Sequence, residues 1–175
     1  ALVRTFGCQQ NVADGQRLKG MLLQMGYTLT TDVDEADLII YNTCAVREHA
    51  QDRVIGNIGA LKHHKRRHPD CIIGVCGCMV QQPHITQRIQ KSYPHVDLVF
   101  GTHVLHRLPE LLYTTLAERR RVFEIPDMDG VIAEGVPVLH DGGVRGWLPV
   151  MYGCNNFCTY CVVPYVRGRE RSRAP

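Results

Sequence analysis

The first 121 residues alternate between two spacings of hydrophobic positions, one typical of buried strands and one typical of amphipathic helices. Short apolar runs without polar alternation indicate strands that are covered on both faces. Between these runs, apolar residues recur every three or four positions, which predicts helices. The predicted strands are residues 2–6, 37–41, 71–75 and 97–100, and the predicted helices are residues 14–26, 46–68, 80–91 and 105–119.

Strands and helices succeed each other without hairpin signals, which predicts an α/β fold. We expect a mostly parallel open sheet with flanking helices and right-handed crossovers, formed by residues 1–121. Residues 122–146 are rich in Gly, Pro and Asp and lack a helical period, so they are interpreted as a linker or an irregular strand segment. Residues 147–151 form a new predicted strand. Because residues 147–175 are too few to build a core, we expect them to be the truncated start of a second domain and to pack poorly.

The chain carries 20 Lys and Arg against 17 Asp and Glu, a formal net charge of +3, and 45% of its residues are hydrophobic. This composition is that of a globular protein, and no apolar run is long enough to predict a membrane span. Positive charge gathers in residues 62–68 and 162–175, where it indicates either a solvated surface or contact with a polyanion such as RNA. The candidate phosphate contacts are Lys62, Lys65, Arg66, Arg67, Arg167, Arg169, Arg171 and Arg173.

Eight cysteines are the unusual feature of the composition. A secreted disulfide scaffold fits poorly with long amphipathic segments, so we expect a reducing compartment and thiols that act as metal or redox ligands. Cys8, Cys44 and Cys78 each follow a predicted parallel strand, and the carboxyl ends of such strands share one rim. Helix N-termini at that rim favour thiolates, so the three predict a shared metal site with an open coordination position. The alternative is that they are small buried apolar residues.

Two further cysteines, Cys71 and Cys76, are expected in the core, with Cys76 the main competitor as a ligand. A separate motif, Cys154-x-x-x-Cys158-x-x-Cys161, places three thiols within eight residues. A zinc site takes four ligands, and no Cys or His follows this motif. Three thiolates alone match an iron–sulfur cluster with one iron left open.

Several motifs resemble one known family. The loop GCNNFCTYC (153–161) is similar to the signature of radical S-adenosylmethionine (radical SAM) enzymes, and VVPYVRGRERSR (162–173) resembles the methylthiotransferases among them. TFGCQQN (5–11), NTCAVREHA (42–50) and GVCGCM (74–79) resemble the three cysteine motifs of that family's N-terminal domain. Gln10 departs from the Met common at its position, but neither residue is a ligand.

The resemblance implies two [4Fe–4S] clusters. Cys154, Cys158 and Cys161 would hold the one that binds and reductively cleaves S-adenosylmethionine, and Cys8, Cys44 and Cys78 the one that handles the inserted sulfur. It further implies the first strand and cluster loop of a radical SAM barrel in residues 147–175, with the rest of the barrel and an RNA-binding domain beyond Pro175. This chain alone is then expected to be inactive. The sequence identifies no catalytic residue besides the cluster ligands.

Within the family, the motifs are most similar to the branch that modifies N6-isopentenyladenosine-37 in the anticodon loop of tRNA. The implied whole protein is cytoplasmic, monomeric and free of the membrane, and it depends on a reducing electron donor. Other branches act on threonylcarbamoyladenosine tRNA or on a ribosomal protein aspartate. Two classes outside the family stay open, namely a non-catalytic iron–sulfur electron-transfer module and a zinc-dependent RNA-binding module.

Overall fold

A five-stranded parallel sheet forms the centre of the protein. The structure is a computed structural model that describes residues 1–46, 48–126, 132–140, 142–144 and 146–174. Among these residues the sheet runs in the order β1-β2-β3-β4-β5, with every neighbouring pair parallel. Its strands are β1 (Leu2–Thr5), β2 (Leu38–Thr43), β3 (Ile72–Gly77), β4 (Leu98–Phe100) and β5 (Val122–Glu124). The predicted α/β class with a parallel open sheet is confirmed.

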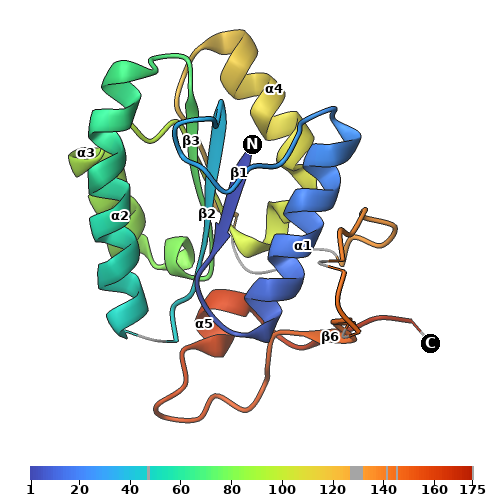
Figure 1. The fold of residues 1–175 in the computed structure, drawn as a ribbon. Coiled ribbons are helices and arrows are strands. Elements are labelled where there is room, and N and C mark those ends of the chain that lie inside the picture. The colour runs from blue at the N-terminus through green and yellow to red at the C-terminus, as the bar shows by residue number, and fades with distance from the viewer. Residues whose placement is uncertain (47, 127–131, 141, 145, 175) are drawn as a thin grey trace.

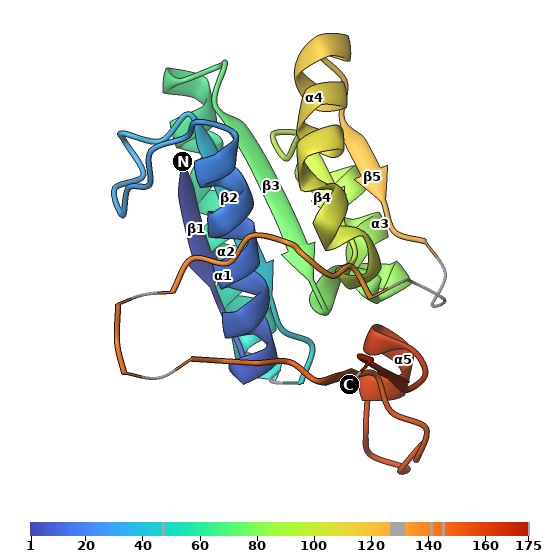
Figure 2. The same cartoon turned by 90° about the vertical axis from the view of Figure 1, so that its right-hand side faces the viewer.

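Helices cover both faces of this sheet, as the two perpendicular views show (Figure 1, Figure 2). One face packs against α1 (Gln9–Gln24) and α4 (Leu108–Glu118), and the other against α2 (Glu48–Arg67) and α3 (Pro83–Ser92). Two 3-10 turns, η1 (Met79–Gln81) and η2 (Thr102–Arg107), precede α3 and α4. None of the helices described here is both long and apolar enough to cross a membrane.

The arrangement of the helices corrects the expected handedness. The strand order is sequential, so crossovers that lie on opposite faces of the sheet have opposite hands. Right-handed crossovers throughout would place all four helices on one face and leave the other face of a parallel sheet uncovered. Both faces of the sheet are therefore buried by crossovers of both hands. The prediction that all crossovers are right-handed is wrong.

The core consists of two apolar layers, one on each side of the sheet. Alternate residues of β2 point to different layers: Ile39 packs with Ile58 of α2, whereas Ile40 packs with Leu22 of α1. Because both layers are buried, the strands are continuous apolar runs in the sequence. Cys71 lies in the first layer and Cys76 in the second, so their assignment as core residues is confirmed.

Two element boundaries differ from the sequence prediction. Helix α1 begins at Gln9, well before Asp14, because Cys8 occupies its N-cap position and the polar residues that follow are already helical. Strand β5 extends the sheet to Glu124, into the predicted linker, since Val122 is buried and pairs with Leu98. The first unit thus reaches three residues beyond the expected boundary at residue 121.

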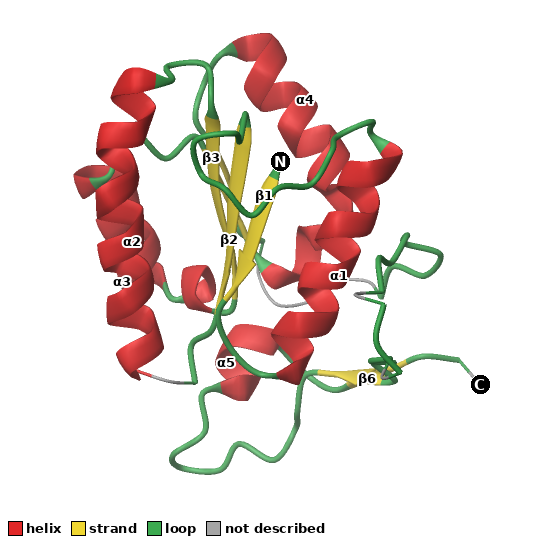
Figure 3. Ribbon diagram, viewed as in Figure 1, coloured by secondary structure: helices red, strands yellow, loops and turns green. Residues whose placement is uncertain are grey.

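The C-terminal segment contains little regular structure (Figure 3). Its elements are β6 (Met151–Tyr152), α5 (Val163–Arg167) and β7 (Arg171–Ser172), with β6 and β7 antiparallel. The predicted strand at 147–151 is wrong except at its last residue, and its apolar side chains stay partly or largely exposed, Trp147 at 41% and Leu148 at 73%. This exposure agrees with the expected poor packing, although α5 is an exception because Val166 is buried.

Candidate functional site

Three of the cysteines lie at the carboxyl rim of the sheet, and we call Cys8, Cys44 and Cys78 the dispersed triad. Strand β1 ends at Thr5, β2 at Thr43 and β3 at Gly77, so each cysteine follows its strand by one to three residues. Cys44 and Cys78 are buried and Cys8 is half-buried. The predicted rim position is confirmed for all three.

Two glycines allow the turns at this rim to pack closely. Gly7 has a φ of +151°, and a Cβ on it would lie 2.7 Å from Cys44 Cβ. Gly77 has a φ of +98°, and a Cβ there would lie 2.4 Å from the carbonyl oxygen of Thr43. The backbone N–H of Cys78 donates to that same oxygen at 2.9 Å. Only glycine allows these close approaches, so the residues before Cys8 and Cys78 bring both cysteines against the end of β2.

A buried amide network fixes the same turns. Asn11 Nδ2 donates to the carbonyl oxygen of Thr43 at 2.8 Å, and Asn42 Nδ2 donates to the carbonyl oxygen of Asn11 at 2.8 Å. Both asparagines are fully buried. Sequence reasoning did not single them out, although both lie within the cysteine motifs, at a position where a buried polar side chain needs partners.

Each sulfur of the dispersed triad has a polar neighbour. Cys8 Sγ lies 3.4 Å from Asn11 Oδ1, and the backbone N–H of Val46 donates to Cys44 Sγ at 3.4 Å. Arg167 Nε donates to Cys78 Sγ at 2.9 Å. Burial raises the pKa of the Cys78 thiol, and the Arg167 guanidinium opposes that shift. Cys44 and Cys78 thus each accept from a donor that favours the thiolate, whereas Cys8 faces an amide oxygen that accepts from its thiol.

Arg167 connects the C-terminal segment to this rim. Its Nη2 lies 2.7 Å from Asp14 Oδ2, with the side chains 8% and 4% exposed. Burial lowers the pKa of Arg167, but Asp14 and Cys78 outweigh that effect and the net shift is upward. The guanidinium therefore stays charged. Arg167 is expected from the sequence to contact RNA phosphate; its burial and its two internal partners place it in the interior instead.

Helix α5 is docked against the rim by one further direct contact and one bridge. Thr102 Oγ1 donates to the carbonyl oxygen of Val166 at 3.3 Å. Arg171 Nη2 contacts both the carbonyl oxygen of Arg167, at 3.1 Å, and Nδ1 of His103 in η2, at 3.2 Å. Figure 1 shows α5 below the carboxyl ends of the strands. A cavity of about 180 Å³ lies between them, and its lining includes Cys8, Cys78, Gly153 and Arg167. The space therefore separates the dispersed triad from the segment that carries the other three cysteines.

The remaining three, Cys154, Cys158 and Cys161, form the compact triad, in the loop between β6 and α5. Cys158 is exposed and the other two are half-buried. The backbone N–H of Cys154 donates to the carbonyl oxygen of Gly168 at 3.1 Å, and that of Cys161 to Cys158 at 2.9 Å. The first bond joins the base of the loop to the residue after α5, and the second forms a turn within the loop.

The donor chemistry of both triads fits iron–sulfur clusters. Within the described part of the chain, only Asp34, His64 and His68 bring three ligand atoms within 4.8 Å of one another. Neither cysteine triad thus converges as closely as the ligands of one zinc ion, for which Zn–S distances are about 2.3 Å. In a cluster each thiolate binds a different iron, so the ligands need not converge on a single ion.

The other candidate phosphate contacts are distributed over two ends of the sheet. Lys62 and Arg66 lie exposed at the C-terminal end of α2, at the amino rim, and stay predictions. Lys65 Nζ is engaged internally, 2.8 Å from Asp97 Oδ2 and 2.6 Å from the carbonyl oxygen of Cys71. Arg67 pairs with Asp34 at 3.1 Å.

Beside the compact triad, Arg169 is exposed and lies 5.7 Å from the ring centroid of Phe157. Arg171 contacts His103 Nδ1 at 3.2 Å, and Arg173 pairs with Glu134 at 3.4 Å. Arg169 is thus the best exposed of these three arginines.

The fold and the two thiol sets define a parallel α/β domain that presents three cysteines at its carboxyl rim, followed by a three-cysteine loop. Residues 1–101 match the model of the family described as Uncharacterized protein family UPF0004, which corresponds to the N-terminal domain of methylthiotransferases. Because this match covers more than half of the chain, the chain belongs to that family. The family resemblance drawn from the motifs is confirmed.

Curated relatives extend the likeness beyond this domain. The chain is 56% identical to the tRNA-2-methylthio-N(6)-dimethylallyladenosine synthase of Acetivibrio thermocellus over 172 residues, which are 98% of this chain and 36% of the relative. It is 53% identical over 171 residues to the synthase of the same name from Caldicellulosiruptor saccharolyticus, again with 98% and 36% covered. It is 52% identical over 172 residues to the synthase of the same name from Clostridioides difficile, which again covers 98% of this chain and 36% of the relative. The chain therefore spans about a third of the length of these relatives.

Proposed function

We propose that the chain is the N-terminal part of a radical SAM methylthiotransferase that converts N6-isopentenyladenosine-37 of tRNA to its 2-methylthio derivative. The observation that carries the proposal is the docking of α5, which directly follows the compact triad, onto the rim that holds the dispersed triad. The Arg167 bonds to Cys78 and Asp14 make this contact specific. The names of the relatives, which specify a tRNA 2-methylthio product, support the choice of substrate.

In this proposal each triad holds a [4Fe–4S] cluster. The cluster held by Cys154, Cys158 and Cys161 would supply reductive cleavage of S-adenosylmethionine, and the one held by Cys8, Cys44 and Cys78 would handle the inserted sulfur. The chain's own residues orient these ligands: Gly7 and Gly77 set the turns, and Arg167 donates to a ligand sulfur. All eight cysteines are free thiols, which suits a reducing cytoplasm and an external electron donor.

The size of the cavity limits what it accepts. At about 180 Å³ it is smaller than the roughly 300–1,000 Å³ of most ligand pockets. It accommodates a small sulfur-bearing group, such as a methylthio group. A target base in an anticodon loop is single-stranded and can be splayed out. The exposed Arg169, which follows α5, is better placed to contact that RNA than the basic end of α2 at the opposite rim.

The test compares cysteine variants of the full-length protein under anaerobic conditions. Cys158→Ala is expected to abolish formation of 5′-deoxyadenosine, because the compact triad alone serves cleavage of S-adenosylmethionine. Cys44→Ala is expected to retain part of that cleavage and to lose methylthio transfer. Cys71→Ala is the matched control, since Cys71 is an equally buried core thiol, and it is expected to keep both activities. Chromatography measures 5′-deoxyadenosine, and mass spectrometry of digested tRNA measures the methylthiolated nucleoside.

Other results would point elsewhere. Normal methylthiolation by Cys44→Ala would refute a role for the dispersed triad. A product on threonylcarbamoyladenosine tRNA or on a ribosomal protein aspartate, in place of isopentenyladenosine, would move the protein to another branch of the family. Absence of 5′-deoxyadenosine from the unaltered protein would favour the electron-transfer or zinc-binding class.

A further inference from the structure

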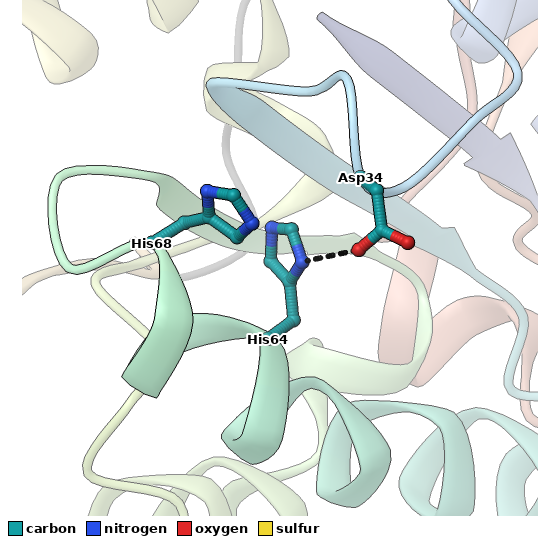
Figure 4. Close-up of side chains that lie close together, drawn as sticks. All are labelled: Asp34, His64 and His68. Carbon is teal, nitrogen blue, oxygen red and sulfur yellow. Dashed lines mark ion pairs between the residues drawn. The ribbon is translucent and has the colours of Figure 1, made fainter.

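A second group of metal-ligating side chains lies at the amino rim of the sheet, away from both cysteine triads. His64 is on the last turn of α2, His68 follows that helix, and Asp34 is in the loop before β2. One ligand atom from each of the three lies within 4.8 Å of the other two. Figure 4 shows the two imidazole rings side by side, with the Asp34 carboxylate next to His64.

The helix explains why the two histidines meet. Residues four positions apart share one face of a helix, and the hydrogen bond from the His68 N–H to the His64 carbonyl oxygen, at 2.9 Å, continues the helical pattern through His68. The rings stack with centroids 4.6 Å apart and planes 26° apart. His68 and Asp34 are exposed, so their side chains can adjust to an ion without disturbing the core.

The buried imidazole of His64 is an independent sign of a ligand at this group. Its side chain is only 4% exposed, yet neither ring nitrogen makes a hydrogen bond to any described atom. The nearest contact is between Nδ1 and Asp34 Oδ1, at 3.4 Å. A buried polar group without a partner is costly, and native proteins normally satisfy it. An ion bound to this ring would provide the partner that the protein atoms do not.

We propose that Asp34, His64 and His68 bind a first-row divalent transition ion, with zinc the best fit. Two imidazoles and a carboxylate are ligands that suit zinc, and a water molecule would complete four-coordination. Arg67 lies 3.1 Å from Asp34 Oδ1 and orients the carboxylate from outside the site. The ion would tie the loop before β2 to the end of α2, which is a structural role independent of the cysteine chemistry.

Zinc titration of the full-length protein tests this site. Calorimetry at pH 8 compares the unaltered protein with His68→Gln, Asp34→Asn and the control His63→Gln, whose exposed histidine is adjacent to His64 but outside the cluster. The unaltered protein and His63→Gln are expected to bind one more equivalent of zinc than the other two, or to bind it at least about tenfold more tightly. Zinc bound by cysteines contributes equally to all four proteins and cancels in the comparison.

Two further readouts keep the proposal independent of the proposed enzyme function. Zinc is expected to raise the thermal midpoint of the unaltered protein and of His63→Gln more than that of His68→Gln. The extra equivalent is expected to disappear at about pH 5.5, where protons compete for the imidazoles. Equal zinc affinity and equal thermal shifts in all four proteins would overturn the site, whatever the cysteine variants show.

Discussion

Arg167 joins the C-terminal segment to the sheet through two buried polar contacts. One guanidinium nitrogen donates to Cys78 Sγ and another pairs with Asp14 Oδ2. Because both charged side chains are almost fully buried, removing one of them leaves the other without compensation. A cationic donor on a ligand sulfur also influences the reduction potential of a cluster bound there. Arg167 thus links the packing of α5 to the electronic properties of the dispersed triad.

Replacing Arg167 tests both effects in the full-length protein. Arg167→Gln is expected to lower the free energy of unfolding by about 3 kcal/mol or more, since Asp14 stays buried and unpaired. It is also expected to make the potential of the dispersed-triad cluster more negative, because a hydrogen bond to sulfur is lost. Denaturant unfolding and an anaerobic redox titration measure the two quantities.

Two controls accompany this variant. Arg169→Gln, at an exposed position of the same segment, should change neither quantity. The double change Asp14→Asn with Arg167→Gln should recover part of the stability, since it leaves no unpaired charge. Equal potentials for Arg167→Gln and the unaltered protein would show that the bond to Cys78 has no electronic role.

At the residue scale, the strand pattern predicted the rim position of the dispersed triad but not the residues that support it. Arg167 lies in a basic run, and the sequence of such a run does not distinguish arginines that face solvent from arginines that are buried. Its partner Asp14 is near the other end of the chain, so nothing local connects the two. The asparagines at 11 and 42 likewise stand within the motifs, and only the fold shows that Asn42 donates to the backbone of Asn11 while Asn11 donates to that of Thr43.

At the element scale, the turns after the strands determine where the cysteines stand. Gly77 ends β3 with a positive φ and lies against β2, so it directs Cys78 toward the rim. Gly26 ends α1 with a similar φ of +88°, but a Cβ there would meet nothing within 4 Å. Substitution of Gly26 therefore measures the free-energy cost of the backbone conformation alone, and substitution of Gly77 adds the cost of a steric clash.

Alanine substitutions at these glycines should differ accordingly. Gly26→Ala is expected to cost on the order of 1 kcal/mol, the conformational penalty alone. Gly77→Ala should cost clearly more, because its Cβ would lie 2.4 Å from the Thr43 carbonyl oxygen and 2.7 Å from Asn42 Oδ1. The resulting shift of Cys78 should also lower the iron content. Unfolding curves and iron analysis measure both; equal costs with unchanged iron would contradict this view of the turn.

Periodicity located four strands and the main helices, because each buries a continuous apolar face. It missed β5 and α5, whose three and five residues are too short to show a period. Both are held by tertiary contacts: β5 by pairing with β4, and α5 by the buried Val166 and Arg167. The strand expected at 147–151 failed for the opposite reason, since its apolar residues pair with no neighbouring strand before Met151 among those described and stay exposed.

At the scale of the whole molecule, the sheet separates two kinds of chemistry. Its carboxyl rim gathers thiols, glycine turns and the docked α5, whereas its amino rim carries the Asp34, His64 and His68 group. Parallel strands make this division possible, because all their carboxyl ends point the same way. The rim position followed from the strand pattern alone. The contact between the rim and α5 did not, because it depends on how two separate segments pack.

We propose that the dispersed triad holds a cluster of its own, and the metal content of the protein measures this directly. Full-length protein purified and reconstituted anaerobically should contain about eight iron and eight sulfide per chain, two [4Fe–4S] clusters. Cys44→Ala should contain about four of each, and Cys76→Ala, which alters a core thiol in β3, should keep about eight. Wild-type iron in Cys44→Ala, or zinc in place of iron in the unaltered protein, would contradict the claim.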